Sequence, residues 1–195
     1  MKFKTIIIII LILFFISGCL FHSEPPNNRE FRNISKVYEL AGVYKNTGEP
    51  SGYITEILWP DIKQIFGANI NHEDIEFIEV IPKDRLLTVK AISKGCSIFE
   101  KKYILGQDFK INDGKIIIHR EAHLLTRGGD DVLLGPSYED LALGIDIVKD
   151  GKYRRSGCAA GLIFMIFPVA FSDTSDIRYE RVSDKPQEFK NCNDS

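Results

Sequence analysis

Short apolar segments separated by turn residues run through most of this chain, and they limit the folds open to it. In residues 141–147, large apolar side chains alternate with small or polar ones, the period-two pattern of a strand with one buried face. Segments rich in Ile, Val, Leu and Phe occupy residues 76–81, 86–92, 97–105 and 115–123, and residues 161–169 are continuously apolar. Further short strands are expected at residues 41–45 and 177–182. Turn signals such as Pro82-Lys83-Asp84 and Asn112-Asp113-Gly114 separate them, so the sequence predicts a mainly β protein.

The connections between these segments are of hairpin length, which predicts an antiparallel up-and-down meander. Such a sheet curls, and closure removes its exposed edges. We therefore expect a small closed or nearly closed β-barrel, with a two-sheet β-sandwich as the alternative. One short helix is expected in the stretch WPDIKQIFG, where Pro60 suits the first turn and Gly67 can cap the end. Trp59 is expected to pack this helix over an end of the barrel.

The N-terminus carries eleven consecutive apolar residues, Ile6 to Ile16, preceded by Lys2 and Lys4. A membrane-spanning helix needs about 20 apolar residues, so this run is too short to cross a bilayer. Apolar cores of about 7–15 residues that follow positive charge are typical of secretion signals. The sequence therefore predicts that residues 1–18 are a cleaved signal peptide.

The end of this signal, Ile16-Ser17-Gly18-Cys19, resembles the lipobox of bacterial lipoproteins. The resemblance implies that Cys19 becomes the first residue of the mature chain, with a diacylglyceryl group on Sγ and an acyl chain on its α-amino group. Several acyl chains anchor a protein essentially permanently. Leu20 stands where an Asp would favour retention in the inner membrane. The resemblance thus implies an outer-membrane lipoprotein, anchored through its lipid and facing the periplasm.

The remaining chain divides by composition into three parts. Residues 19–35 are polar and contain Pro25-Pro26, which predicts a tether. Residues 36–183 form the expected β-barrel-like domain, and residues 184–195 a polar C-terminal tail. The periplasm is oxidising and permits a disulfide. In a meander, pairing Cys158 with Cys192 would pin the tail over the neighbouring strand, and pairing Cys158 with Cys96 is the alternative.

The motifs for catalysis and for metal or nucleic-acid binding are incomplete. The net charge of −2, without a basic block, argues against nucleic-acid binding. His119 and His123 are four residues apart, but on a strand they would be separated by about 13 Å, too far to share a metal ion. Neither a nucleophile elbow nor a phosphate-binding loop occurs. We expect no enzymatic activity, no cofactor and no metal.

Gly42-Val43-Tyr44 on the first predicted strand, with Arg178 or Arg181 on the last, resembles the lipocalin pattern, with Tyr in place of the usual Trp. This resemblance implies barrel closure. Two functions remain open. The first is a non-enzymatic binding or interaction module with an envelope protein as its partner. The alternative is a lipocalin-like carrier of a small apolar ligand. Bulky side chains filling the interior would favour the first, and a large apolar cavity would favour the second.

Overall fold

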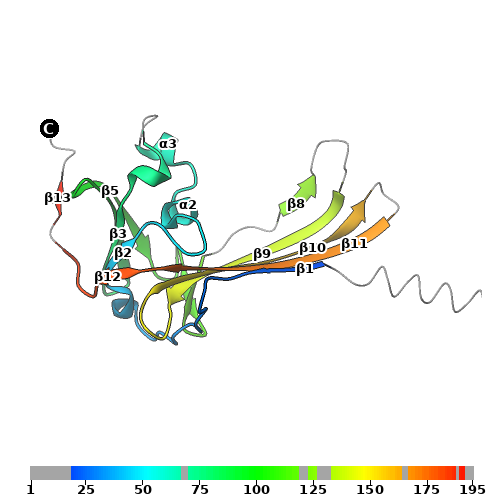
Figure 1. Ribbon diagram of the computed structural model, residues 1–195, viewed down its shortest axis with the longest axis horizontal. Coiled ribbons are helices and arrows are strands. Elements are labelled where there is room, and N and C mark those ends of the chain that lie inside the picture. The colour runs from blue at the N-terminus through cyan, green and yellow to red at the C-terminus, as the bar shows by residue number, and fades with distance from the viewer. Residues whose placement is uncertain are drawn as a thin grey trace, which may run out of the picture. The chain divides into compact units, whose positions relative to one another are not determined.

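The computed structural model describes residues 19–66, 70–118, 123–126, 133–163, 167–187 and 189–191. The expected signal peptide, residues 1–18, lies outside them. Strands dominate the described residues and form two mixed sheets (Figure 1). The prediction of a mainly β protein is confirmed.

One sheet has six strands in the order β12-β2-β3-β4-β5-β13. These strands are β2 (Gly42–Lys45), β3 (Phe77–Lys83), β4 (Leu86–Ser93), β5 (Cys96–Ile104), β12 (Arg181–Ser183) and β13 (Lys190–Asn191). The run from β2 to β5 is antiparallel, as expected for a meander. β13, in contrast, pairs with the start of β5 in parallel.

The other sheet has seven strands, with the order β1-β11-β10-β9-β7-β6 and with β8 paired to β9. Its strands are β1 (Cys19–Ser23), β6 (Lys110–Asn112), β7 (Lys115–Ile118), β8 (His123–Thr126), β9 (Leu133–Ile145), β10 (Gly151–Ile163) and β11 (Phe167–Tyr179). The segments expected as single strands at residues 161–169 and 177–182 are each divided. The first contains the end of β10 and the start of β11, and the second is interrupted at Glu180.

The expectation of a closed barrel is wrong for the described residues. After the turn at residues 106–108, the chain leaves the six-stranded sheet, and β6 pairs with β7 in the other sheet. It returns at Glu180, between β11 and β12. Because the chain changes sheets at these two points, β5 is followed in space by β13 and not by β6, and the sheet does not continue around a barrel.

Contacts between Cα atoms divide the chain into two compact units. Unit 1 comprises residues 1–23, 120–141 and 155–175, and unit 2 comprises residues 24–119, 142–154 and 176–195. Strands β9, β10 and β11 contribute residues to both units. Unit 2 holds the six-stranded sheet, β6, β7 and the described helices: η1 (Val37–Leu40), α2 (Ile54–Leu58), α3 (Ile62–Phe66) and η2 (His72–Asp74). No helix in the described part of the chain is long and apolar enough to span a bilayer.

The expected helix is present as α3, within the stretch WPDIKQIFG. Trp59 precedes it and is 1% exposed, and its ring meets the Phe99 ring of β5 edge-on, with 5.1 Å between centroids. Trp59 therefore packs the helical segment onto a sheet, although not onto a barrel. A second short helix, α2, ends immediately before Trp59 and was not predicted from the sequence.

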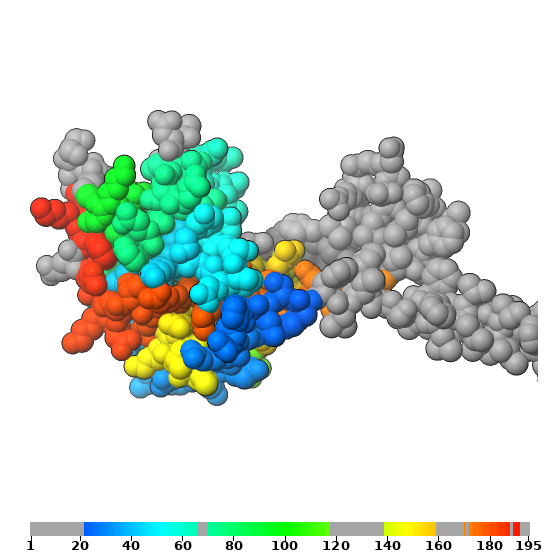
Figure 2. Space-filling model, in the orientation of Figure 1, coloured from blue at the N-terminus to red at the C-terminus, as the bar shows by residue number. Residues whose placement is uncertain are grey.

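The segments expected as a tether and a polar tail both pack against strands. β1 pairs in parallel with β11 over all five of its residues. Further along, Ile34 is buried and the Arg32 backbone N–H donates to the Ile145 carbonyl at 2.8 Å. Figure 2 shows these blue N-terminal residues lying beside the yellow β9–β10 turn on the surface of unit 2. In the tail, the Gln187 N–H donates to Glu79 Oε1 at 2.6 Å.

The states of Cys96 and Cys158 do not match either disulfide that we expected. Cys96 is disulfide-bonded, whereas Cys158 is an exposed free thiol, so neither pairing proposed for Cys158 occurs. Cys192 lies outside the described residues. The physical reason is the parallel register of β13, which places Lys190 opposite Cys96 and so directs the tail to the start of β5 and not to β10.

Candidate ligand-binding site

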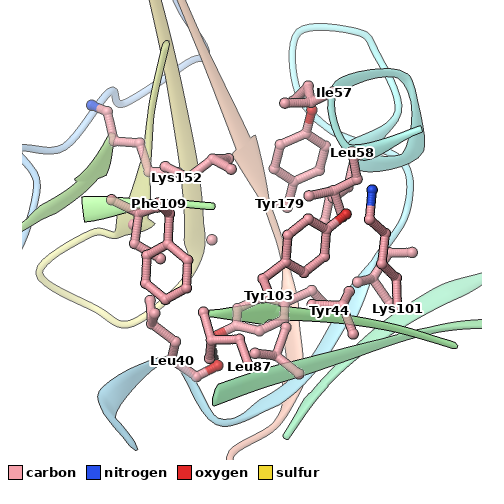
Figure 3. A pocket seen from close by; sticks show the side chains of 18 of the residues that line it. Leu40, Tyr44, Ile57, Leu58, Leu87, Lys101, Tyr103, Phe109, Lys152 and Tyr179 are labelled. Carbon is pink, nitrogen blue, oxygen red and sulfur yellow. Dashed lines mark hydrogen bonds between the residues drawn. The ribbon is translucent and has the colours of Figure 1, made fainter. Parts of the chain in front are cut away.

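A cavity of about 340 Å³ lies within unit 2 (Figure 3). This volume falls within the usual range for small-molecule sites, roughly 300–1,000 Å³. Its walls come from both sheets, from η1 and from α2. The lining is predominantly aliphatic and aromatic, and consists of Leu40, Tyr44, Ile54, Ile57, Leu58, Ile78, Val80, Leu87, Val89, Lys101, Tyr103, Asp108, Phe109, Ile116, Leu143, Gly144, Gly151, Lys152 and Tyr179.

The period-two pattern of β3, β4 and β5 produces one wall of this cavity. Ile78 and Val80 on β3, and Leu87 and Val89 on β4, are separated by two residues, so each pair lies on one face of the sheet. Val89 is also directly opposite Lys101 of β5. Residues between them face away from the cavity, which is why the apolar wall can form on strands that also carry charged side chains.

Asn46 positions α2 over the cavity. Its side chain is fully buried, and Oδ1 accepts a hydrogen bond from the Thr55 N–H at 3.1 Å. Its Nδ2 group donates to the carbonyls of His72 at 2.7 Å and Ile75 at 3.0 Å. One amide thus satisfies a backbone N–H of α2 and two carbonyls at the end of η2. No local sequence pattern marks Asn46 for this role, because its partners are remote in the chain.

Three tyrosines contribute hydroxyl groups to the lining. Burial raises the pKa of Tyr44 to about 12 and that of Tyr103 to about 12, and burial raises the pKa of Tyr179 further. All three phenols are therefore protonated donors at neutral pH. Tyr44 Oη donates to the Leu40 carbonyl at 3.0 Å. Tyr179 is 1% exposed, and its hydroxyl has no hydrogen-bond partner among the described residues.

Two lysines line the cavity, and their surroundings differ. The Lys152 ammonium is buried and points away from the other labelled side chains in Figure 3. It donates to Asn28 Oδ1 at 2.6 Å and lies 3.0 Å from Asp176 Oδ2. Lys101 is exposed, and its ammonium lies over the Tyr103 ring, 5.1 Å from the centroid. Lys101 has no ion pair with a described residue.

Asp176 is the centre of the buried charge network that holds Lys152. Its carboxylate is fully buried and accepts two hydrogen bonds from Arg154, at 2.6 and 2.7 Å, and one from Asn28 at 2.8 Å. Burial raises the Asp176 pKa, but the hydrogen bonds from Arg154, Asn28 and Lys152 outweigh it and hold the pKa well below its ordinary value. The network fixes the cavity wall formed by Lys152 and joins it to the N-terminal segment through Asn28.

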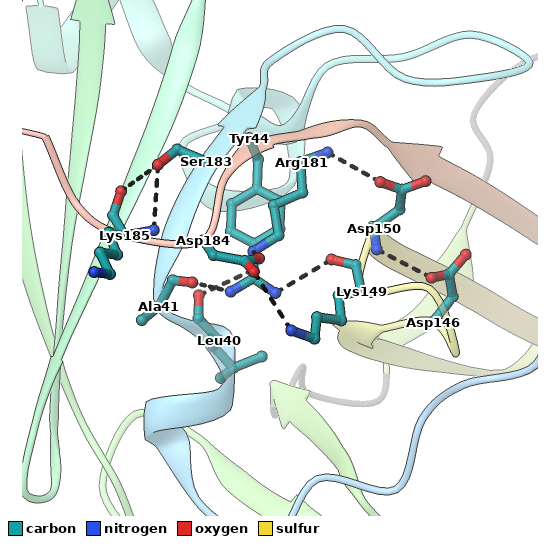
Figure 4. Close-up of polar contacts among 10 residues, drawn as sticks. All are labelled: Leu40, Ala41, Tyr44, Asp146, Lys149, Asp150, Arg181, Ser183, Asp184 and Lys185. Carbon is teal, nitrogen blue, oxygen red and sulfur yellow. Dashed lines mark hydrogen bonds and ion pairs between the residues drawn. The ribbon is translucent and has the colours of Figure 1, made fainter.

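Tyr44 and Arg181, which are far apart in the sequence, are in contact (Figure 4). Arg181 lies over the Tyr44 ring, with Cζ 5.4 Å from the centroid, and donates to the Ala41 carbonyl. Gly42 permits this approach, because a Cβ there would lie 2.8 Å from Arg181 Nε. The other candidate, Arg178, instead pairs with Glu49 at 2.5 Å. The contact holds β12 against β2 without closing a barrel.

The remaining sequence-predicted site residues lie elsewhere. Cys19 is the first residue of β1, opposite Phe171 of β11. His123 begins β8, while His119 lies outside the described residues. In the described part of the chain, no group of three or more potential metal ligands occurs. Lys101, Tyr179 and Asp176 were not identified from the sequence, because none belongs to a motif.

We compared the chain with known protein families, curated proteins and solved structures. No protein-family model, curated protein or solved structure matches this chain.

Proposed function

We propose that this protein is a lipid-anchored envelope protein that binds a small, mainly apolar molecule and carries it or senses it. The observation that supports binding is the cavity of about 340 Å³ in unit 2 with its largely aliphatic lining. A domain of this kind normally fills its interior with side chains, and voids larger than a water molecule are few. An apolar cavity of ligand size, with a few polar groups, is the usual form of a small-molecule site.

The cavity favours the carrier over a module that acts only through its surface. Phe109 and Tyr44 do enter the interior, yet they leave this volume open. Apolar contacts along the walls would drive binding, at about 25 cal/mol for each Å² of apolar surface removed from water. An envelope protein partner remains compatible with this function, because a carrier must receive and release its cargo.

Anchoring is the second part of the proposal and depends on the lipobox-like sequence at Ile16–Cys19. If Cys19 is acylated, the lipid is attached directly to the first residue of β1, with no free spacer before the strand. Mass spectrometry of the mature protein tests this part. We expect an N-terminal peptide that begins at Cys19 and carries acyl groups, and its loss in Cys19→Ser. An unmodified N-terminus in membranes from the native host would contradict the anchor.

Binding is tested with N-phenyl-1-naphthylamine, an apolar dye whose fluorescence rises out of water. Val89 is 5% exposed and lines the cavity, so Val89→Phe should fill part of it and weaken dye binding about tenfold. Thr88→Phe provides the matched control, because Thr88 is adjacent on β4 and its side chain lies on the other face. Equal dye binding by wild type and both variants would place the dye outside the cavity and contradict the proposal.

A further inference from the structure

The polar groups of the cavity gather near α2. Figure 3 shows the hydroxyl oxygen of Tyr179 on the side of Ile57 and that of Tyr103 on the side of Leu58, with the Lys101 amine on the same side. The Lys101 ammonium lies 5.1 Å from the Tyr103 ring centroid, which confirms that these two residues are close. Two phenolic hydroxyls and one ammonium thus lie in one region of an otherwise apolar lining.

All three groups can donate hydrogen bonds, and each can still donate at least one to a ligand. A buried hydroxyl without a partner is costly, so the Tyr179 hydroxyl favours a ligand that supplies an acceptor. Tyr103 lies beside the Trp59 indole, and burial raises its pKa to about 12, so it also stays protonated. Lysine carries three donors and no acceptor.

The charged side chains near the cavity indicate which charge a ligand would carry. Lys152 already forms an ion pair with Asp176, at 3.0 Å. Asp108 also lines the cavity, and its negative charge acts on Tyr103. Its Oδ2 accepts a hydrogen bond from the Ile104 N–H at 2.7 Å and does not pair with Lys101. Lys101 is therefore the cavity cation that has no carboxylate partner among the described residues.

We infer that the ligand is an anionic amphiphile. Its aliphatic part occupies the cavity, and its anionic, acceptor-bearing head group lies near α2, where it accepts from the Lys101 ammonium and the Tyr179 hydroxyl. A carboxylate with a short alkyl chain has this chemistry. The inference rests on the proposed binding function and names the ligand class for the same site.

The test compares alkyl carboxylates with alkyl alcohols of equal length, at 8, 10 and 12 carbons, by displacement of N-phenyl-1-naphthylamine at pH 8. A carboxylic acid is ionised at this pH. We expect the carboxylate to bind about tenfold more tightly than the alcohol, the effect of roughly one charge-assisted hydrogen bond. Lys101→Met should remove this preference.

Lys102→Met is the matched control, because Lys102 is the next residue on β5, lies on the opposite face and pairs with Glu100 at 3.6 Å. It should keep the preference for the carboxylate. Tyr179→Phe should weaken carboxylate binding about threefold or more, and a control thermal melt would show that this variant is folded.

The outcomes separate the two proposals. Equal binding of carboxylate and alcohol by the wild type, or a preference that survives Lys101→Met, would overturn the head-group inference and leave the apolar binding function intact. If neither the carboxylates nor the alcohols displace the dye, the inference of an amphiphilic ligand is overturned. Failure of the dye itself to bind overturns the proposed function as well.

Discussion

A carboxylate buried as completely as that of Asp176 requires compensation, because removing an ion from water costs several kcal/mol. Arg154 supplies two hydrogen bonds from its guanidinium, and Lys152 and Asn28 approach the same carboxylate. The Phe31 ring adds an apolar surface between the cations, 5.2 Å from Lys152 Nζ and 5.5 Å from Arg154 Cζ. Removal of the Asp176 charge would leave the buried Lys152 ammonium without its carboxylate partner.

Asp176→Asn tests this dependence. We expect the free energy of unfolding to fall by about 3–5 kcal/mol, the usual cost of breaking a buried ion pair by removing one partner. Urea denaturation followed by circular dichroism measures the change. Asp173→Asn, on the same strand but only half-buried, is the control and should cost less than about 1 kcal/mol. A loss below 1 kcal/mol for Asp176→Asn would contradict the role of the network.

The lowered Asp176 pKa also predicts how stability depends on pH. The unfolded chain binds a proton at this carboxyl at a higher pH than the folded protein does. Stability from Asp176 is therefore fully present above the unfolded pKa, near 4, and is lost as the pH falls through the acid range. This contribution should leave urea midpoints unchanged from pH 7 to about pH 5, and make them fall more steeply for the wild type than for Asp176→Asn between about pH 5 and pH 2. Parallel curves for the two proteins would refute the assignment.

Among the elements, α2 is too short to be stable alone, since helices below about 12 residues are marginal in water. Its position depends on the Asn46 amide and on the packing of Ile54, which is 8% exposed. The Ile54 N–H also donates to the Asn46 carbonyl at 2.9 Å. The position of α2 over the cavity thus depends largely on Asn46, which directly follows β2.

Asn46→Ala should leave the Thr55 N–H and two carbonyls without their partner. At about 1–3 kcal/mol for each buried group left unsatisfied, we expect a loss of at least 2 kcal/mol in unfolding free energy. Hydrogen exchange should become faster across residues 54–58, and dye release should accelerate. Thr47→Ala, at the exposed neighbouring position, should change neither rate. Unchanged exchange in Asn46→Ala would show that α2 is held by other contacts.

The β13–β5 pairing leads to a prediction about the disulfide. Cys96 is bonded and Cys158 is free, so the partner of Cys96 is Cys19 or Cys192. Lys190 and Asn191 pair with Cys96 and Ser97, and Cys192 is the next residue in the sequence. Peptide mapping under non-reducing conditions should find Cys96 linked to Cys192, with Cys158 open to alkylation. A link from Cys96 to Cys19 or Cys158 would contradict this register.

At the scale of the whole molecule, the cavity and the charge network both belong to unit 2, whereas Cys19 belongs to unit 1. The chain therefore places the expected anchor and the expected ligand site in different compact units. Strands β9, β10 and β11 have residues in both units, but all residues that line the cavity belong to unit 2.

This division predicts where a ligand stabilises the protein. Dodecanoate at 100 times its Kd should add about 2.7 kcal/mol to the unfolding free energy of the part that binds it. Hydrogen exchange measured by mass spectrometry should slow in residues 76–105 and 142–154 of unit 2. Peptides from residues 133–141 of unit 1 provide the internal control and should exchange as before. Protection confined to unit 1 would place the ligand elsewhere.

The sequence by itself determined the β content, most strand positions in residues 41–118 and the helix after Trp59. These features depend on local patterns: period-two alternation, turn residues and the placement of Pro60. The signal peptide and the acylation of Cys19 stay predictions from the same local information.

Only the tertiary structure decided how the strands divide between two sheets, and therefore that they do not close a barrel. It also decided the cavity and its polar groups, because these depend on which distant residues meet. Asn28 and Asp176 are 148 residues apart, and Asn46 and Ile75 are 29 apart. Local patterns specify which side chains share a face of a strand, but the partner of that face is chosen by packing over the whole unit.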